Sequence, residues 1–288
     1  MKKCLFTGAC TALVTPFIDN QVNYPMLEML IRHQIDSGIH TVVISGTTGE
    51  APTLTDQEKI AMVSRCKSYA GDDCMIIVGT GSNSTEHAVR LSEEAEQAGA
   101  DGLLIVTPYY NKANSDGLYV HYWTIAQHTD LPIILYNVPS RTGVDIPISV
   151  YRELSKISNI AGVKEAGGDI RKTTYCMAEC DLPVWSGCDE LTVPMMAIGA
   201  RGVISVLSNV FPKETSAVCG AALAGNYPKA SSLMQQLLPA INLLFCEVNP
   251  IPVKYAMKLI GFDCGPCRLP LTKLSEGNRQ KIEAFFKK

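Results

Sequence analysis

The chain has 288 residues, 47% hydrophobic and 18% charged, with a formal net charge of −3. This balance argues against a nucleic-acid surface, and no stretch approaches the roughly 18 uninterrupted apolar residues that a membrane span needs. The eleven cysteines are an odd number scattered along a long chain, which favours free thiols in a reducing cytoplasm over a disulfide framework.

The start of the chain resembles a signal peptide, but the apolar run around Leu5 is shorter than the roughly 7–15 residues such a segment needs. We therefore expect a cytoplasmic protein that binds small molecules or further copies of itself.

Short, nearly continuous apolar runs follow one another along the first two thirds of the chain, as buried parallel strands do. Their starts are separated by about 20 to 34 residues, the length of one strand plus one crossover helix. The eight predicted strands are Gly8–Phe17, His40–Gly46, Cys74–Gly81, Asp101–Pro108, Pro132–Pro139, Ile160–Ala166, Leu182–Gly187 and Gly202–Asn209.

Helix signals lie between these runs. Thr55 and Glu58 have the spacing of a capping box, and an amphipathic helix over Thr85–Ala98 should end at Gly99. Two further helices are predicted over Asp169–Cys180 and Asp189–Ala200. Eight consecutive strand–helix units favour a closed (β/α)8 TIM barrel over an open doubly wound sheet, which usually has about five or six strands.

Strand signals stop near Gly225, and the rest of the chain has the pattern of three helices, over Tyr227–Phe245, Pro252–Ile260 and Ser275–Phe286. The absence of a Pro-rich or Ser/Gly linker suggests that this part packs on the barrel. We therefore expect a barrel over residues 1–224 that carries the active site, and a C-terminal helical subdomain over residues 225–288.

The active site of such a barrel lies at the carboxyl ends of its strands. Lys164 stands there in an apolar strand, where burial favours the neutral amine that attacks a ketone to form a Schiff base. The two-residue period of a strand should also turn Gly162 inward and leave space for a substrate below the amine. Alternatively, Lys164 leaves the barrel mouth for solvent or pairs with Glu165.

Other strand ends offer proton carriers and carboxylate ligands. Tyr136 and Tyr110 can pass protons through a hydroxyl such as that of Thr47, although buried tyrosines more often serve only packing. Arg141 has the planar fork that grips a carboxylate, unless it is a plain surface arginine. The glycine-rich turn at residues 46–49 has backbone amides that can bind an anion, but a tight turn explains it as well.

Metal and redox sites find less support. None of the five histidines forms a zinc motif. Cys264 and Cys267 have the spacing of thioredoxin-like proteins, but they lie between two predicted helices rather than after a strand. A thiol redox or ligand-binding protein built on the barrel remains an alternative. The active site proposed here needs no metal and no cofactor.

With these residues assembled, the chain resembles, end to end, the pyruvate-dependent class I aldolase family that contains N-acetylneuraminate lyase and dihydrodipicolinate synthase. The resemblance rests on Gly-Thr-Thr-Gly-Glu at 46–50, Tyr-Asn-Val-Pro-Ser-Arg-Thr-Gly at 136–143, Val-Lys-Glu-Ala at 163–166 and Asn-Pro-Ile-Pro-Val-Lys at 249–254. Arg141 is typical of the synthase branch of the family and would be out of place in a sugar-acid lyase.

This resemblance implies a lyase of lysine and diaminopimelate biosynthesis that condenses pyruvate with L-aspartate 4-semialdehyde. It makes Lys164 the Schiff-base lysine, and Tyr136, Thr47 and Tyr110 the proton relay, with Tyr110 reaching in from a neighbouring subunit of a homotetramer. It further implies that Thr48 and Ile204 hold pyruvate, and that Arg141 and Gly187 hold the semialdehyde. The alternative within the family is an aldolase for a sugar acid of the 2-keto-3-deoxygluconate or N-acetylneuraminate type.

The resemblance breaks down where lysine-regulated members bind their feedback inhibitor. The corresponding residues are Ala51, Pro52, Asp56, Lys59, Asn83, His87 and Tyr109. His87 stands where those members have an acidic partner for the lysine ammonium, and Lys59 adds a like charge. Losing one charge-assisted hydrogen bond weakens binding about tenfold or more, so we expect weak or absent inhibition by lysine.

Overall fold

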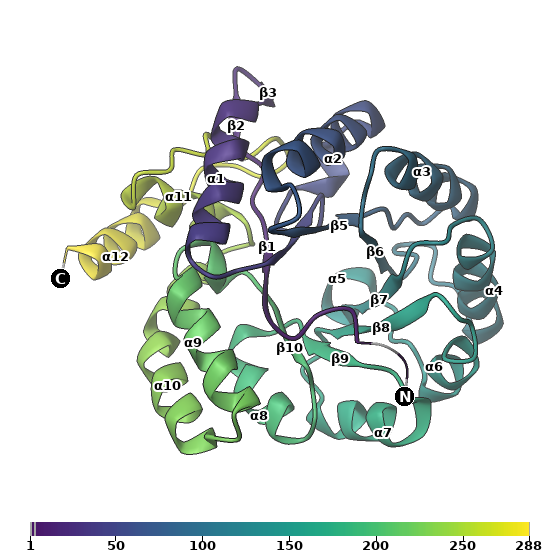
Figure 1. Cartoon of the computed structure of the whole chain (residues 1–288). Helices are drawn as coiled ribbons and strands as arrows, with labels where there is room; N and C mark the ends of the chain where they lie inside the picture. The colour runs from purple at the N-terminus through teal and green to yellow at the C-terminus, as the bar shows by residue number, and fades with distance from the viewer. Residues whose placement is uncertain (1, 3, 288) are drawn as a thin grey trace.

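The structure is a computed structural model that describes residue 2 and residues 4–287. Eight parallel strands close into a barrel in the order β1-β10-β9-β8-β7-β6-β5-β4, and Figure 1 shows the ring of helices around it. The strands are β1 (Gly8–Ala12), β4 (Thr41–Ile44), β5 (Met75–Gly79), β6 (Gly102–Val106), β7 (Ile133–Asn137), β8 (Ile160–Glu165), β9 (Val184–Ser186) and β10 (Gly202–Ser205). The predicted (β/α)8 TIM barrel is confirmed.

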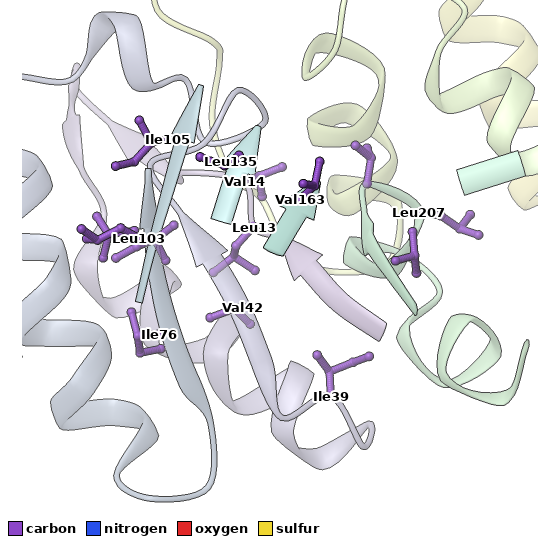
Figure 2. Packing of buried hydrophobic residues seen from close by; sticks show 14 of the residues in the cluster. Leu13, Val14, Ile39, Val42, Ile76, Leu103, Ile105, Leu135, Val163 and Leu207 are labelled. Carbon is purple, nitrogen blue, oxygen red and sulfur yellow. The ribbon is translucent and has the colours of Figure 1, made fainter. Parts of the chain in front are cut away.

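Alternation along the strands divides the apolar residues into two cores, because successive side chains point to opposite faces. One core fills the barrel and includes Val43, Ile134 and Trp185. The other lies between the strands and the helices, where Figure 2 shows Ile76, Leu135 and other branched side chains. Inward and outward positions follow from this alternation, and they decide which polar side chains reach the barrel mouth.

Helices connect the strands and pack outside them. Thr55 and Glu58 form the predicted capping box, and Gly99 follows α3 with a φ of +94°, which glycine adopts easily. The α-helices of the barrel are α1 (Tyr24–Asp36), α2 (Asp56–Ala70), α3 (Thr85–Gln97), α4 (Ser115–Ala126), α5 (Pro139–Thr142), α6 (Ile148–Leu154), α7 (Ile170–Cys180), α8 (Thr192–Ala197) and α9 (Pro212–Leu223), and the 3₁₀ turns are η1 (Ala51–Thr53), η2 (Asp189–Leu191) and η3 (Leu207–Asn209).

Two segments differ from the prediction. The run Gly8–Phe17 is not one strand, because β1 ends at Ala12 and β2 (Phe17–Ile18) pairs with β3 (Gln21–Val22) in a small hairpin. The segment Asp189–Ala200 is not one helix either, since a 3₁₀ turn precedes α8. The carboxylate of Asp189 is buried and accepts hydrogen bonds from outside its own helix, which draws this first turn inward.

The C-terminal helices are α10 (Tyr227–Leu244), α11 (Ile251–Leu259) and α12 (Glu276–Phe286). They lie against the barrel helices: the Phe286 ring stacks on Phe211 at 5.9 Å, and the Phe262 ring lies 4.6 Å from His33 of α1. Figure 1 shows α11 and α12 outside the helix ring, beside α1. No helix within the described residues is long and apolar enough to cross a membrane.

Candidate active site

A cavity of about 530 Å³ opens at the carboxyl ends of the strands. Thr47 lines it from the turn after β4, Tyr136 from the end of β7, and Arg141 from α5. The structure thus brings together three of the predicted site residues around one space, which is large enough for two small substrates. Arg141 lies on a short helix, and the residue is exposed at the cavity wall.

Lys164 lies on β8 directly opposite Tyr136 of β7 in the strand ladder. Its side chain is buried, with 6% of the residue exposed, and its Nζ lies 4.3 Å from the centre of the Tyr136 ring. Lys164 therefore points into the barrel beside the cavity, as expected for an amine that attacks a ketone. The alternatives of a solvent-exposed lysine or a Lys164–Glu165 pair are wrong.

Glu165 instead points out of the barrel and ties β8 to β7. Asn137 Nδ2 donates to both oxygens of Glu165, at 2.9 and 3.0 Å, and the backbone N–H of Gly167 donates at 2.7 Å. Burial raises the pKa of the Glu165 carboxyl, although the charge of Lys172 and these hydrogen bonds oppose the rise. Together these contacts hold the ends of the two strands that carry Lys164 and Tyr136.

The space expected beside Gly162 is absent. A Cβ atom on Gly162 would lie 2.4 Å from the carbonyl oxygen of Pro183 and 2.5 Å from the Trp185 ring. The Trp185 indole fills the barrel below Lys164 and stacks on Phe6 at 4.6 Å. Gly162 therefore permits close packing of β9, and the Trp185 ring closes the barrel interior below Lys164.

The turn after β4 is fixed by residues far along the chain, which the sequence analysis missed. Asn249 Nδ2 donates to Thr48 Oγ1 at 3.0 Å, and Lys254 Nζ lies 2.9 Å from the Glu50 carboxylate. Thr48, Glu50 and Lys254 are all buried. Only the Asn-Pro-Ile-Pro-Val-Lys motif pointed to this part of the chain, and it suggested no role.

Ile204 and Gly187 lie at two further strand ends. Ile204 is 1% exposed and belongs to the same interior cluster as Tyr136. A Cβ on Gly187 would lie 2.6 Å from that of Ala166, so only glycine lets β9 end this close to β8. Asp189 accepts from Ser205 and from the backbone N–H of Leu207, and thereby fixes the turn after Ile204.

Tyr110 is not in this cavity. The residue is 89% exposed and has a φ of +73°, which is unusual for a side chain of this size. Within the described residues no hydrogen bond joins Tyr136 to Thr47 or Tyr110. A single chain thus contains the lysine, one tyrosine and the threonine of the predicted relay, but leaves the second tyrosine outside.

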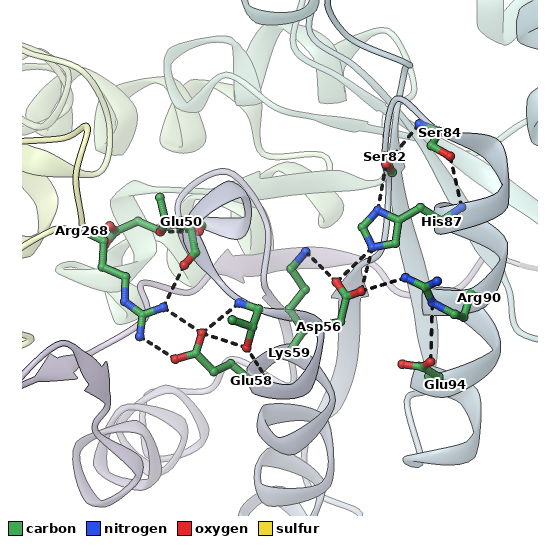
Figure 3. A network of polar contacts seen from close by, with 12 residues as sticks. Glu50, Asp56, Glu58, Lys59, Ser82, Ser84, His87, Arg90, Glu94 and Arg268 are labelled. Atoms are coloured by element: carbon green, nitrogen blue, oxygen red, sulfur yellow. Dashed lines mark hydrogen bonds and ion pairs between the residues drawn. The ribbon is translucent and has the colours of Figure 1, made fainter.

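The outer part of the same cavity carries a charged cluster, shown in Figure 3. The Asp56 carboxylate accepts from His87 Nε2 at 2.9 Å and from Arg90 at 3.1 Å, and Lys59 Nζ lies 3.9 Å away. Burial opposes ionisation of Asp56, but the hydrogen bonds to His87 and Arg90 and the charge of Lys59 hold its pKa below the usual range. The Asp56 carboxylate is thus already surrounded by basic groups, one of which, Arg90, also lies 3.8 Å from Glu94.

The environment of the thiols disfavours a redox site. All eleven cysteines are free, and burial raises the pKa of both Cys264 and Cys267 to about 12. Thiolate is therefore scarce near neutral pH, which disfavours the redox alternative. Among the residues that the structure describes, no cluster of three or more His, Cys, Asp or Glu side chains is placed to hold a metal ion.

Comparison with known proteins gives a consistent result. A model of the Dihydrodipicolinate synthetase family matches residues 5–288. The chain is 44% identical to the 4-hydroxy-tetrahydrodipicolinate synthase of Acetivibrio thermocellus, over 100% of this chain and 98% of that protein. It is 45% identical to the enzyme of the same name from Lachnoclostridium phytofermentans, over 99% of this chain and 98% of the relative.

Solved structures agree. The crystal structure of dihydrodipicolinate synthase from Aquifex aeolicus superposes with a TM-score of 0.96 at 41% identity, covering 98% of this chain and 97% of that one. That of Thermotoga maritima also has a TM-score of 0.96, at 40% identity over 98% of both chains.

Proposed function

The chain belongs to the Dihydrodipicolinate synthetase family, and from this we propose that it condenses pyruvate with L-aspartate 4-semialdehyde to give 4-hydroxy-tetrahydrodipicolinate. It is then a lyase of the class I aldolase type in lysine and diaminopimelate biosynthesis. The observation that carries the proposal is the burial of Lys164 inside the barrel, with its Nζ 4.3 Å from the centre of the ring of Tyr136, which lines the cavity.

The reaction begins at the amine. The neutral Lys164 Nζ attacks the ketone carbon of pyruvate and water leaves, which forms an imine. Loss of a proton from the methyl carbon gives an enamine, and this carbon then forms a bond to the aldehyde carbon of the semialdehyde, whose oxygen gains a proton. The amino group of the product finally attacks the imine carbon, closes the ring and displaces Lys164.

The neighbouring residues take the roles that this chemistry requires. Tyr136 passes protons to and from the reacting atoms, with Thr47 and the Tyr110 of a neighbouring subunit completing the relay. Thr48 and the backbone near Ile204 hold pyruvate, whereas Arg141 and the space beside Gly187 hold the semialdehyde. The exposed position of Tyr110 and the place of Arg141 on the cavity wall support these assignments.

The assembly and the location of the protein follow from the same proposal. A site that needs Tyr110 from a second chain requires at least a dimer, and we place the enzyme in the cytoplasm as a homotetramer. Within each chain, residues 1–224 form the catalytic barrel and residues 225–288 a helical subdomain packed on it.

Inhibition by lysine is weak or absent in this proposal. A lysine ammonium in the cavity would meet Lys59 and His87, and Asp56 already pairs with these two groups and with Arg90. An assay of the purified enzyme with increasing lysine checks this, and half-maximal inhibition at sub-millimolar lysine would contradict it.

Borohydride trapping tests the central claim. Incubation with pyruvate and sodium borohydride, followed by mass spectrometry, should show one pyruvate-derived adduct, located on Lys164. Lys164→Ala should lose both the adduct and nearly all turnover, while Cys264→Ser should retain turnover. An adduct elsewhere, or none, would refute the aldolase chemistry, and cleavage of sugar acids without condensation would refute the substrate assignment.

A further inference from the structure

Two contacts between side chains join the C-terminal part of the chain to the catalytic turn after β4. One is the hydrogen bond from Asn249, just before α11, to Thr48, and the other is the ion pair between Lys254 of α11 and Glu50. The partners are 201 and 204 residues apart in sequence. Both contacts are buried, so water does not compete for them.

Both side chains of the ion pair have further partners. One oxygen lies 2.9 Å from Lys254 Nζ, and the other accepts from the backbone N–H of Arg268 at 2.8 Å. Lys254 Nζ also donates to the carbonyl oxygen of Pro266 at 3.0 Å and lies 4.5 Å from the centre of the Phe17 ring. Figure 3 shows Arg268 between Glu50 and Glu58. The side chains of Glu50 and Lys254 are only 1% and 3% exposed.

The turn that they hold has an unusual backbone. Ser45 and Glu50, at its two ends, have φ angles of +51° and +57°, a backbone region that residues other than glycine rarely adopt. Such a conformation persists only where surrounding contacts impose it. Besides its contacts with the C-terminal part, the turn is held by Thr15 Oγ1, which donates to the Gly49 carbonyl oxygen at 2.7 Å.

The Asn249 contact also sets the direction in which the Thr48 hydroxyl donates. A threonine hydroxyl carries a single hydrogen and can accept as well as donate. Because Asn249 Nδ2 donates to Thr48 Oγ1, that hydrogen stays free for another acceptor. The acceptor that the proposed function brings to Thr48 is the carboxylate of pyruvate, and a hydrogen bond to a charged group is a strong one.

We propose that Asn249 and Lys254 are positioning residues for pyruvate binding: Asn249 turns the Thr48 hydroxyl toward the substrate carboxylate, and Lys254 holds the turn through Glu50. The inference rests on the proposed function, since it needs pyruvate at Thr48. It predicts that both residues affect the first substrate and not the second, although neither touches a reacting atom.

Substitutions of Asn249 test the hydroxyl direction. Asn249→Asp replaces the donor by an acceptor that takes the Thr48 hydrogen for itself, whereas Asn249→Ala only removes the donor. The pyruvate concentration that half-saturates borohydride trapping of Lys164 should rise about tenfold or more in Asn249→Asp and less in Asn249→Ala. The KM for the semialdehyde should stay within about twofold of the wild-type value.

The test of Lys254 must separate a loss of positioning from a loss of stability. Lys254→Met alone leaves the buried Glu50 carboxylate without its ion-pair partner and can prevent folding. The double variant Glu50→Gln/Lys254→Met removes both charges. Its urea concentration of half-unfolding should lie closer to that of the wild type than the value for Lys254→Met does. The pyruvate concentration that half-saturates trapping of this double variant should still be several-fold higher than in the wild type. Lys258→Met, on the same helix with an exposed ion pair, is the matched control and should change neither quantity.

The outcomes are distinguishable. If the wild type itself gives no adduct on Lys164, the proposed function fails. If the wild type is trapped but the folded Asn249 and double variants are half-saturated at the wild-type pyruvate concentration, the positioning roles are refuted. They are equally refuted if kcat falls in proportion to the folded fraction while both KM values stay unchanged, because that is the result of a purely structural role.

Discussion

The Tyr136 side chain combines two functions that one substitution can separate. Its ring lies over Lys164 Nζ, while its hydroxyl is the proposed proton carrier. Tyr136→Phe keeps the ring and removes the hydroxyl. We expect borohydride trapping of pyruvate to persist and kcat/KM to fall by about 10²-fold or more, the usual contribution of general acid–base catalysis.

Tyr175→Phe, at an exposed position of α7, is the control for this comparison and should have no effect. Loss of trapping in Tyr136→Phe would show that the hydroxyl is needed already for imine formation. Unchanged turnover would remove Tyr136 from the relay.

At the level of single residues, the sequence indicated members of the proposed site where a local pattern marked them. Lys164 and Tyr136 could be found because charged or polar groups at the ends of apolar strands are unusual. Asn249 and Asp189 could not, since their partners Thr48 and Leu207 are apparent only once the chain has folded. Gly162 was wrongly interpreted because the Trp185 ring, from the next strand, occupies the space that its missing side chain leaves.

Among the secondary-structure elements, β8 and β9 depend on glycine for their contact. Gly162→Ala brings a methyl group to 2.4 Å from the Pro183 carbonyl oxygen, so backbone or indole must move. We expect the free energy of unfolding to fall by about 1–3 kcal/mol, the usual cost of overpacking a core. Urea denaturation measures it. Gly220→Ala in α9, where a methyl group meets nothing within 4 Å, should instead raise stability by up to about 1 kcal/mol.

Helices α3 and α4 meet at His121, which makes their contact sensitive to acid. His121 is 3% exposed, its Nδ1 lies 2.9 Å from Thr85 Oγ1, and its Nε2 has no partner within the described residues. Burial lowers its pKa from 6.5 to about 4. Below pH 6.5 the unfolded chain therefore binds a proton that the folded chain does not, so the contribution of His121 to stability is lost as the pH falls from 6.5 toward 4.

The size of this effect can be measured by difference. At pH 5 the wild type should have lost about 2 kcal/mol at this residue relative to pH 7.5, from 1.36 kcal/mol per pH unit below 6.5. His121→Asn, which can still bond to Thr85, should lose correspondingly less over the same range in urea denaturation. His128→Asn, at an exposed histidine, should follow the wild type, and equal losses in all three proteins would contradict the assignment.

Element by element, the barrel strands were predictable because each is a short apolar run, and some of the helices that follow, such as α2 and α3, begin with a side-chain N-cap. The β2–β3 hairpin was not, because strands of two residues contain no period to detect. Its turn consists of Asp19 and Asn20, both with positive φ, and Asp and Asn are among the residues that tolerate this conformation. Contacts outside the hairpin, such as Phe17 N–H to the Cys264 carbonyl oxygen at 2.9 Å, help to hold it.

For the whole molecule, the position of Tyr110 determines whether one chain can work alone. A large, 89% exposed aromatic side chain on a strained backbone is costly unless another surface covers it. If each site takes Lys164 from one chain and Tyr110 from the next, two inactive variants can complement each other. Tyr110→Phe keeps a functional lysine, and Lys164→Ala keeps a functional Tyr110.

Equal amounts of these two variants should therefore regain activity when their subunits are exchanged by dissociation and reassembly. Random pairing makes half of the dimers hybrids, and one of the two sites in each hybrid is complete, so about a quarter of the wild-type turnover should return. Borohydride trapping with pyruvate should then modify only the Tyr110→Phe chain, which retains Lys164. Mass spectrometry distinguishes the two chains by their masses. If Tyr110 acts within its own chain, no combination contains a complete site and the mixture stays as inactive as its components, which would rule out the shared site and with it the need for an oligomer.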